Sequence, residues 1–343
     1  MQNDWRTFLS QYGAEIDEHG KINFSGNAQQ EISMVNKHCL LSSLELGIIH
    51  VTGNDAQTFL QGQFSNDINL LSPDSCQITA YCNPKGRMLA QFLVIPAADG
   101  YFLILPSALM QKTIIRLRMF VLRSEVTLAD VSNELVCFGL IGDQSLVELT
   151  GLPQNDYELT KFGELLVTKI PSLPNRYLLL GPVEAATNFA NSQIGHCKLV
   201  SNHVWNWLDI QAGIPSIQAE TVEEFVPQML NLELIGGVNF KKGCYPGQEI
   251  VARMHYLGKP KRRMFKLHTD TTAVPSSGDD LYLKGGDGQS AGKVVIAEPA
   301  LNKGTDLLAV IRLNHAGSEA LCLGSEDGPL LKFENLPYSL DAD

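Results

Sequence analysis

Apolar and polar positions alternate over short stretches in the first 132 residues, a pattern typical of β-strands with one buried face. Between these stretches, apolar residues recur every three or four positions, as on one face of a helix. We therefore predict strands at 44–51, 76–82, 88–95 and 101–105 and helices at 56–61 and 107–122. The tetrapeptide Asn83-Pro84-Lys85-Gly86 separates two of these strands and predicts a hairpin turn.

Two further stretches carry a similar mixture of strand and helix patterns. Residues 1–44 predict a short helix from Trp5 to Gln11 and a hairpin that turns at His19-Gly20, which we interpret as an appendage. Residues 133–197 predict strands at 135–141, 165–170 and 177–180 and helices at 145–149 and 183–191. A helix at 204–212 follows.

Helical periodicity disappears after Arg263. Short β-like runs then occupy 264–268, 281–284, 293–297 and 307–313, and Gly-rich turns separate them. This spacing of short strands predicts a small C-terminal β-barrel over 263–343.

The composition is that of an ordinary globular protein, with 44% of the 343 residues hydrophobic and 18% charged. The length suffices for two or three domains. A net charge of −11 disfavours nucleic-acid binding by the whole surface. The first ten residues contain Asp4 and no apolar stretch of signal-peptide length, and no transmembrane segment is visible. We therefore expect a cytoplasmic protein that does not contact membranes.

The seven cysteines lack the spacing of a disulfide framework, which predicts free thiols in a reducing compartment. Cys76 and Cys82 would lie about 20 Å apart along an extended strand, too far to share an ion. The adjacent pairs His38-Cys39 and His196-Cys197 would point their side chains apart. We therefore expect no metal site formed by these residues.

The loop around Cys244 carries the most distinctive chemistry in the chain. Pro246 suits the second position of a type II turn and Gly247 the positive φ that follows, and the apolar spacing from Ile250 predicts a helix beyond the turn. Two lysines before Cys244 and the dipoles of nearby helical amides favour a thiolate, the nucleophilic and metal-binding form. The structural alternative is a free Cys that packs as a small hydrophobic residue.

Charged residues close to this loop have structural interpretations as well. Glu249 and Arg253 lie four positions apart, so we expect them to pair across one helix face. The segment from Lys259 to Lys266 holds five cations in eight residues. It is either a solvated face or an attractor for a polyanion, such as the glutamate tail of a folate or an RNA backbone.

Several short motifs lie in sequence between Phe225 and Arg253. They are Phe225-Val226-Pro227-Gln228, Asn231-Leu232-Glu233, Gly236-Gly237, Lys242-Gly243-Cys244-Tyr245 and Gly247-Gln248-Glu249, followed by Arg253. Three motifs elsewhere accompany them: Asn66-Asp67, Lys85-Gly86-Arg87 and Pro337-Tyr338-Ser339-Leu340. Together these motifs resemble those of the YgfZ-type folate-binding proteins, a family similar to aminomethyltransferase, the T-protein of the glycine cleavage system.

The resemblance implies an α+β fold in which two ferredoxin-like units and a C-terminal β-barrel surround a central channel that holds a tetrahydrofolate. It implies a discontinuous folate-binding domain at 45–132 and 198–262, a second α+β domain at 133–197 and the barrel at 263–343. Residues 1–44 remain the appendage. The family role so implied is the maintenance of iron–sulfur enzymes, including ones that thiolate tRNA.

The resemblance also assigns site residues. It makes Cys244 the reactive thiol of the motif formed by Lys242, Gly243, Tyr245, Gly247, Gln248, Glu249 and Arg253. It implies folate contacts by Trp205, Gln228, Asn66 and Asp67. A second Trp of the family's folate site falls near Leu46, which leaves Trp205 as the aromatic candidate. On pattern alone, Trp205 would be a core residue of an amphipathic helix.

Two departures from the T-protein pattern bear on catalysis. The acidic pair that follows the Lys-Gly turn in aminomethyltransferases is replaced by Ala90 and Gln91. Their Pro-x-Glu folate contact is replaced by Pro227-Gln228, whose amide can hydrogen-bond a pterin but cannot take its proton.

Three functions remain open from the sequence. The first is a tetrahydrofolate-binding accessory protein for iron–sulfur cluster assembly or repair, without classical catalytic activity or a stable metal. The second is a folate-dependent one-carbon (aminomethyl) transferase, which Ala90 and Gln91 disfavour. The third is a tRNA-binding module, which the acidic composition disfavours. We expect folate and iron–sulfur assembly proteins or client enzymes as partners, without direct tRNA binding.

Overall fold

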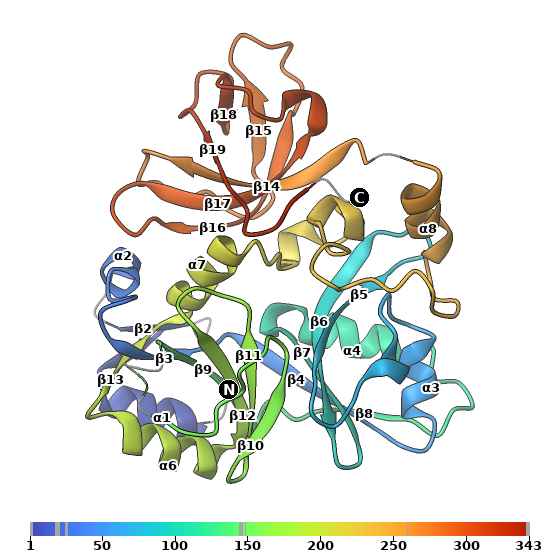
Figure 1. The fold of residues 1–343 in the computed structure, drawn as a ribbon, viewed down its shortest axis with the longest axis vertical. Helices are drawn as coiled ribbons and strands as arrows, with labels where there is room; N and C mark the ends of the chain where they lie inside the picture. The colour runs from blue at the N-terminus through green and yellow to red at the C-terminus, as the bar shows by residue number, and fades with distance from the viewer. Residues whose placement is uncertain are drawn as a thin grey trace. The chain divides into compact units, whose positions relative to one another are not determined.

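The computed structural model describes residues 3–17, 21–24, 27–143, 147, 149–258 and 260–340. The chain divides into two compact units, each built from three stretches of sequence. The first unit holds residues 1–56, 71–77 and 93–208, and the second holds 57–70, 78–92 and 209–343. Figure 1 follows the chain from blue to red through these stretches. The predicted bounds of the three domains stay a prediction.

A six-stranded sheet organises the first unit (Figure 1). Its strand order is β10 (Leu159–Phe162), β11 (Leu165–Ile170), β12 (Arg176–Pro182), β9 (Leu135–Ile141), β3 (Cys39–Ser43) and β13 (Cys197–Val200). Neighbouring strands are antiparallel except β3 and β13, which are parallel. Almost every residue of β9 and β12 is buried, as expected of central strands covered on both faces.

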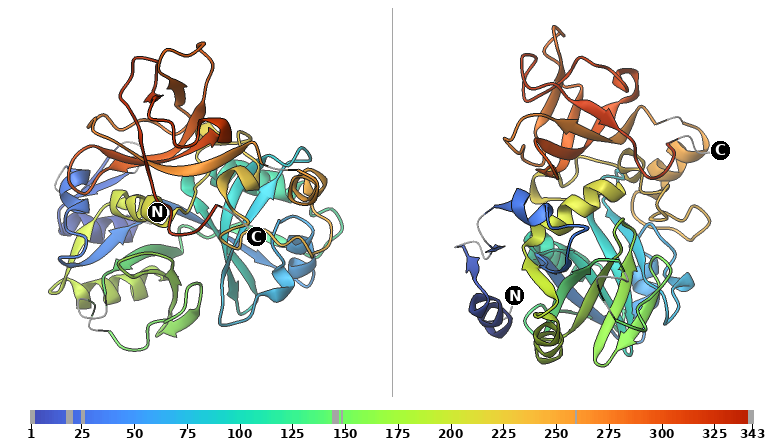
Figure 2. Two further views of the ribbon diagram at one scale, coloured as in Figure 1. Left: turned by 45° about the horizontal axis from the view of Figure 1, so that its top comes forward. Right: turned by 60° about the vertical axis from the view of Figure 1, so that its left-hand side comes forward.

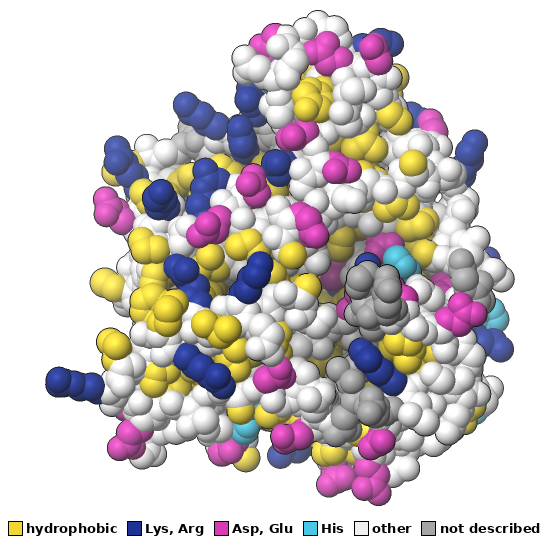
Figure 3. All heavy atoms as spheres, turned by 180° about the vertical axis from the view of Figure 1, so that it is seen from behind, with side chains coloured by type: hydrophobic (Ala, Val, Ile, Leu, Met, Phe, Trp, Pro, Cys, Tyr) yellow, Lys and Arg dark blue, Asp and Glu magenta, His cyan; other side chains and the backbone are white. Residues whose placement is uncertain are grey.

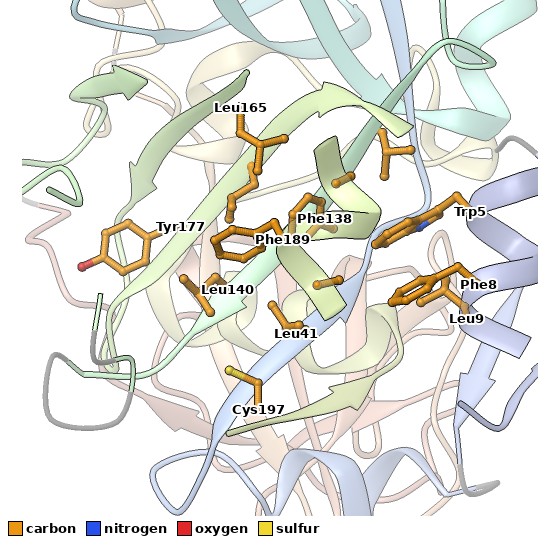
Figure 4. Close-up of a cluster of buried hydrophobic side chains, with 14 of the residues drawn as sticks. Trp5, Phe8, Leu9, Leu41, Phe138, Leu140, Leu165, Tyr177, Phe189 and Cys197 are labelled. Atoms are coloured by element: carbon orange, nitrogen blue, oxygen red, sulfur yellow. The ribbon is translucent and has the colours of Figure 1, made fainter. Parts of the chain in front are cut away.

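Two helices contribute to the core on this sheet, α1 (Asn3–Gln11) and α6 (Val183–Gln193). Figure 4 shows Trp5 and Phe8 of α1 directed at Phe138 of β9, next to Phe189 of α6. The ring centroids of Trp5 and Phe138 are 5.5 Å apart, and those of Phe138 and Phe189 are 5.8 Å apart. Such tilted aromatic contacts stabilise a core beyond the area they bury.

The N-terminal segment is therefore part of this core, which differs from its interpretation as an appendage. Beyond α1, β1 (Ala14–Ile16) and β2 (Ile22–Phe24) form the predicted hairpin, although its turn at His19-Gly20 lies outside the described residues. The segment continues through α2 (Ala28–Ile32) into β3, which lies inside the six-stranded sheet.

A disulfide joins Cys39 to Cys197 across β3 and β13. The two residues are register partners of adjacent parallel strands, and their Cα atoms lie 4.4 Å apart. The prediction of free thiols is therefore wrong for these two cysteines. They are separated by 158 residues, so spacing along the chain gave no sign of their contact in the sheet.

A five-stranded sheet has the order β5 (Gln77–Cys82), β6 (Met88–Ala97), β7 (Gly100–Pro106), β4 (Leu46–Thr52) and β8 (Thr127–Asp130). All but β8 were predicted from the sequence. The helices accompanying these strands are α3 (Ala56–Gln61), η1 (Ile68–Leu70), η2 (Ser107–Leu109) and α4 (Met110–Arg118). The predicted helix at 107–122 is thus a 3-10 turn followed by a shorter α-helix.

The C-terminal sheet lies wholly in the second unit and curls into a half-barrel (Figure 2). Its order is β18 (Leu321–Leu323), β15 (Asp280–Leu283), β16 (Gly292–Pro299), β17 (Thr305–Arg312), β14 (Arg262–Thr269) and β19 (Lys332–Glu334), all antiparallel. The four longer strands match the predicted β runs. A register shift between Val294 and Ile296 of β16 is of the kind that bends a strand.

The remaining helices are α7 (Asn202–Ala212), η3 (Ala219–Thr221), η4 (Pro227–Leu230), α8 (Gln248–Tyr256) and η5 (Leu313–His315). The predicted helix at 145–149 lies outside the described residues except for Val147 and Leu149. No described helix is long and apolar enough to cross a membrane. On the face drawn in Figure 3, many Lys and Arg side chains stand among exposed hydrophobic ones.

Candidate functional site

The loop from Lys241 to Gly247 forms the predicted turn directly before α8. Gly247 has φ 83° and ψ 0°, the values of the third residue of a type II turn. The Gln248 amide closes the turn by donating to Tyr245 O at 3.1 Å. The Val251 amide donates to Gly247 O at 3.2 Å, so the helix starts at the end of the turn.

Gly247 lies against the hairpin turn between β5 and β6. A Cβ atom at this position would lie 2.5 Å from Asn83 O and 2.7 Å from Gly86 Cα, closer than real Cβ atoms approach. The hairpin turn itself is closed by the Gly86 amide, which donates to Asn83 O at 2.9 Å. Two of the sequence motifs, at 85–87 and 242–249, are thus in backbone contact.

The side chain of Lys242 holds the loop in place. Its ammonium donates to Gln61 O at 2.6 Å and to Phe64 O, and it lies 5.1 Å from the centroid of the Tyr245 ring. Burial lowers the pKa of Lys242 to about 8, while the nearby Asp67 carboxylate opposes that shift. The lysine therefore ties the motif to the backbone that follows α3.

Asn66 adds a second link between the same segments. Its Nδ2 donates to Ile78 O at 2.9 Å and to Gly236 O at 2.7 Å, and its Oδ1 accepts from the Asp67 amide. Ser65 Oγ donates to Gly237 O at 2.8 Å. Asn66 and Asp67 thus lie close to the Lys242 motif, and the polar atoms of Asn66 are bonded within the chain. The predicted folate contacts of both residues stay predictions.

Cys244 is the exposed thiol of this loop. Of the five free cysteines in the described chain, the other four are buried. Burial raises the pKa of Cys76 and of Cys82 to about 12, which keeps both as thiols at neutral pH. A thiolate-dependent reaction with a partner in solution is therefore open to Cys244 and closed to these buried thiols.

The two charged ends of the motif do not form the expected pair. Glu249 and Arg253 are both exposed on α8, and no hydrogen bond or ion pair joins them. Gln248 instead turns back, and its Nε2 lies 3.4 Å from Lys242 O and from Gly243 O. The side chain of Arg253 is thus left available to solvent.

Buried acceptor atoms collect on η4 and the turn that follows it. Gln228 Nε2 donates to Val251 O at 2.6 Å, but Gln228 Oε1 has no hydrogen-bond partner. Asn231 Nδ2 donates to Met264 O at 2.8 Å, but Asn231 Oδ1 has none. The same is true of Glu233 Oε2. Buried polar atoms are rarely left without partners, so these three acceptors can receive donors from a ligand.

Arg263 holds this group of acceptors together. Its guanidinium donates to Gln228 O at 3.0 Å and forms an ion pair with Glu233 Oε1. Burial raises the pKa of Glu233, and the Arg263 charge acts in the opposite direction. Asn231 and Glu233 were part of the sequence motif but carried no predicted role of their own, and Arg263 was predicted only as one cation of the basic segment from Lys259 to Lys266. The sequence signal for Asn231 and Glu233 was that these two polar residues flank Leu232, which is buried.

Trp205, the aromatic folate candidate, is a buried residue of α7 in the first unit. The Arg176 guanidinium carbon lies 4.5 Å from the centroid of the indole ring, and Arg176 Nη1 donates to Trp205 O at 3.1 Å. A Cβ atom on Gly139 would lie 2.6 Å from Trp205 Cε3. These contacts fit the core interpretation of Trp205, and its folate contact stays a prediction.

The basic segment divides into two parts. Lys259 lies outside the described residues. Arg263 and Lys266 have structural partners, since Lys266 lies 3.0 Å from Glu334 Oε2 and donates to Gln211 at 2.5 Å. Lys261 and Arg262 are exposed. Within the described part, the segment is therefore neither a uniform solvated face nor a uniform anion site.

One group of potential metal ligands occurs among the described residues. His268, Asp306 and Glu334 place one ligand atom each within 4.8 Å of one another. His268 Nδ1 lies 2.7 Å from Asp306 Oδ1, and the Lys266 ammonium lies beside Glu334. The carboxylates therefore already have hydrogen-bonding and cationic partners.

Comparisons with known proteins agree with the sequence resemblance. The family model of the GCVT N-terminal domain matches residues 9–174. The tRNA-modifying protein YgfZ of Escherichia coli O45:K1 (strain S88 / ExPEC) is 30% identical over 295 residues, which cover 85% of this chain and 90% of that protein. The tRNA-modifying protein YgfZ of Enterobacter sp. (strain 638) is 30% identical over 306 residues, covering 88% and 94%.

A solved structure shares the fold. The crystal structure of the glycine cleavage system aminomethyltransferase T from Bartonella henselae aligns with a TM-score of 0.77 and 15% identity, over 98% of this chain and 97% of that one. The prediction of an α+β, aminomethyltransferase-like fold is confirmed.

Proposed function

The chain belongs to the YgfZ family, and from this premise we propose that it is a tetrahydrofolate-binding accessory protein that supports iron–sulfur enzymes, including ones that modify tRNA. Its action on tRNA would be indirect, through those enzymes. Two features of the second unit support the proposal: the buried acceptors around Arg263 and the exposed thiol of Cys244.

The buried acceptors carry the folate part of the proposal. Gln228 Oε1, Asn231 Oδ1 and Glu233 Oε2 are buried without donors, an arrangement that costs stability in the free protein. The reduced pterin of tetrahydrofolate presents ring N–H and amino groups, which are donors of the kind these atoms lack. When bound, tetrahydrofolate would supply a carrier for a one-carbon unit. Gln228 and Glu233 would hold its pterin, and the amide of Gln228 would orient it without taking its proton.

Aminomethyl transfer is the less favoured function. Ala90 of β6 is fully buried, and it stands with Gln91 where the resemblance places the acidic pair of the aminomethyltransferases. Neither side chain can act as a general base at neutral pH. Formation of methylene-tetrahydrofolate from an aminomethyl donor by the purified protein would reverse this preference.

Titration with tetrahydrofolate tests the folate part. The wild-type protein should bind saturably, and Gln228→Leu should bind at least tenfold more weakly because a buried acceptor worth about 1.5 kcal/mol is lost. Gln57→Leu, at an exposed position of α3, is the matched control and should bind like the wild type. Thermal unfolding of each variant shows whether it is folded at the titration temperature. Absence of saturable binding by the wild type would refute the folate part.

Complementation in cells tests the role of the thiol. In cells lacking this protein, Cys244→Ala should restore the activity of iron–sulfur-dependent tRNA-modifying enzymes no better than an empty vector. Cys322→Ala removes a buried thiol of β18 and should restore it fully. Equal restoration by both variants would remove Cys244 from the proposed function.

A further inference from the structure

One flank of α8 is apolar and is only partly covered by the protein. Val251, which is fully buried, and the hydrogen bond from Gln228 to Val251 O fasten the inner face. About a quarter turn around the helix from Val251, Ile250, Met254 and Leu257 follow one another at spacings of four and three residues and so form one stripe. Leu257 is 84% exposed and Ile250 39%. Ile250 lies partly against Gly86, and Met254 is half-buried. An apolar stripe at helical spacing is normally buried, so the surface of this one that stays exposed lacks a partner.

This stripe forms the wall of a groove. The groove has a volume of about 390 Å³ and is lined by the stripe, by Met229 of η4, by Gly258 and by three cations, Arg253, Lys261 and Arg262. A second hollow of about 680 Å³ shares Lys261 and Arg262 and adds Arg312 and Leu313, an exposed leucine. The two hollows therefore adjoin at Lys261 and Arg262, and their cations form a basic border beside the apolar stripe.

The cations of this border are unpaired. None of the described residues that line the two hollows is acidic. The side chains of Arg253, Lys261, Arg262 and Arg312 form no ion pair within the described chain, whereas the adjacent Arg263 is paired with Glu233. In a protein with a net charge of −11, four free cations around these two adjoining hollows create a local field that attracts acidic groups.

We propose that the α8 groove, defined by Met229, Ile250, Arg253, Met254, Leu257, Lys261 and Arg262, docks an acidic amphipathic helix of a partner protein. The stripe from Ile250 to Leu257 is about 10 Å long at 1.5 Å per residue, which matches two turns of a partner helix. Apolar anchors spaced i, i+3 or i+4, i+7 on that helix enter the groove, and its Asp and Glu side chains meet the basic border.

The chemistry of the groove favours a protein over RNA. Its apolar lining is aliphatic, formed by Met229, Ile250, Met254 and Leu257. RNA bases bind by stacking on aromatic rings or guanidinium planes, and they gain little from an aliphatic stripe. Aliphatic side chains of a partner helix gain the full benefit of removing both surfaces from water. Because the proposal rests on this surface alone, it stands independently of folate binding and of Cys244.

A peptide-display experiment tests the proposal. A library of 16-residue peptides is selected on the intact protein at low salt and counter-selected on a Met254→Ser/Leu257→Ser variant. We expect enriched sequences with apolar residues at i, i+3 or i+4, i+7 and an excess of Asp and Glu. A synthetic peptide of the enriched sequence should bind the double variant at least tenfold more weakly than the wild type. Leu70→Ser, at a 70% exposed leucine of the same unit, should bind it like the wild type.

A separate affinity measurement tests the cations of the basic border. Arg253→Gln/Arg262→Gln should weaken the peptide at low salt and flatten the dependence of its affinity on salt. Three binding results would overturn the proposal. They are selection of no acidic apolar pattern, equal binding of the peptide by the wild type and Met254→Ser/Leu257→Ser, and loss of tRNA rather than peptide affinity in Met254→Ser/Leu257→Ser. A fourth overturning result is a dimer of the wild type in sedimentation that Met254→Ser/Leu257→Ser lacks, because the occupant is then a second copy of this chain.

Discussion

At the scale of single residues, two glycines of the Cys244 loop differ in how far the structure requires a glycine at their position. Gly247 has a positive φ and backbone atoms of the β5–β6 turn within 3 Å of a hypothetical Cβ, whereas Gly243 has neither a positive φ nor any atom within 4 Å of one. We predict that Gly247→Ala lowers the free energy of unfolding by about 1–3 kcal/mol, because strain and a clash add. Urea denaturation measures this change.

Gly243→Ala is the matched control for that substitution. It should change the free energy of unfolding by less than about 0.5 kcal/mol, as surface substitutions usually do. Equal effects of the two substitutions would mean that the Gly247 turn is not held against the hairpin at residues 83–86.

The residue types of the loop already predicted its turn, because Pro246 and Gly247 restrict the backbone locally. The hydrogen-bond partners of Lys242 could not be predicted from residue types in this way. Gln61 O and Phe64 O are backbone atoms about 180 residues away, and any residue type at those positions would offer the same carbonyl. The failed pair of Glu249 and Arg253 shows the converse, since spacing permits an exposed pair that contributes too little to fix it.

At the scale of elements, a few side-chain bonds fasten the motif segment to the backbone after α3. Asn66 supplies one of them, to Gly236 O, and its second bond, to Ile78 O, holds the Asn66 side chain against β5. We predict that Asn66→Ala speeds amide hydrogen exchange in a peptide covering 234–243 by about tenfold, since each lost bond costs roughly 1 kcal/mol of local stability. Exchange followed by mass spectrometry measures it.

Asn69→Ala serves as the control for that measurement, because Asn69 is exposed and its bond to Gln57 lies outside the motif. It should leave exchange over 234–243 unchanged. Unaltered exchange in Asn66→Ala would show that the other links hold the segment by themselves.

Strands were predicted correctly where the hydrophobic pattern was long. They were missed where a short segment becomes a strand only by pairing with its neighbours in the sheet. β9 and β11 have the predicted bounds, because their runs of buried Val, Leu and Ile are strand-like by themselves. β8, β10 and β13 have four residues each and mix polar with apolar side chains, so their sequences carry no clear strand pattern and they become strands through their neighbours. The buried acceptors at Gln228, Asn231 and Glu233 were equally invisible, because lacking a partner is a property of the folded surroundings.

At the scale of the whole molecule, the state of the seven cysteines can be counted. The structure has one disulfide and five free thiols, of which Cys244 is exposed. We predict that an aromatic disulfide reagent at neutral pH reacts quickly with one thiol of the folded protein and with five after unfolding in denaturant without reductant. Burial and raised pKa values protect the other thiols, such as Cys76 and Cys82, while the protein is folded.

Cys244→Ala should abolish the fast reaction and leave four thiols in the unfolded protein. A total of seven thiols in the unfolded wild type would show that Cys39 and Cys197 are reduced in solution. A fast reaction that survives in Cys244→Ala would place a second accessible thiol in the folded protein.

The position of β3 has a consequence for how the protein is made. All five residues of this strand are buried between β9 and β13, yet Cys197 is synthesised 158 residues after Cys39. At about 5–20 residues per second, the nascent strand waits roughly 8–30 s after leaving the ribosome before both of its neighbours exist. An unpaired apolar strand is prone to aggregate during such an interval. The first unit can therefore close only after β13 has been synthesised, and until then β3 lacks one of its two neighbouring strands.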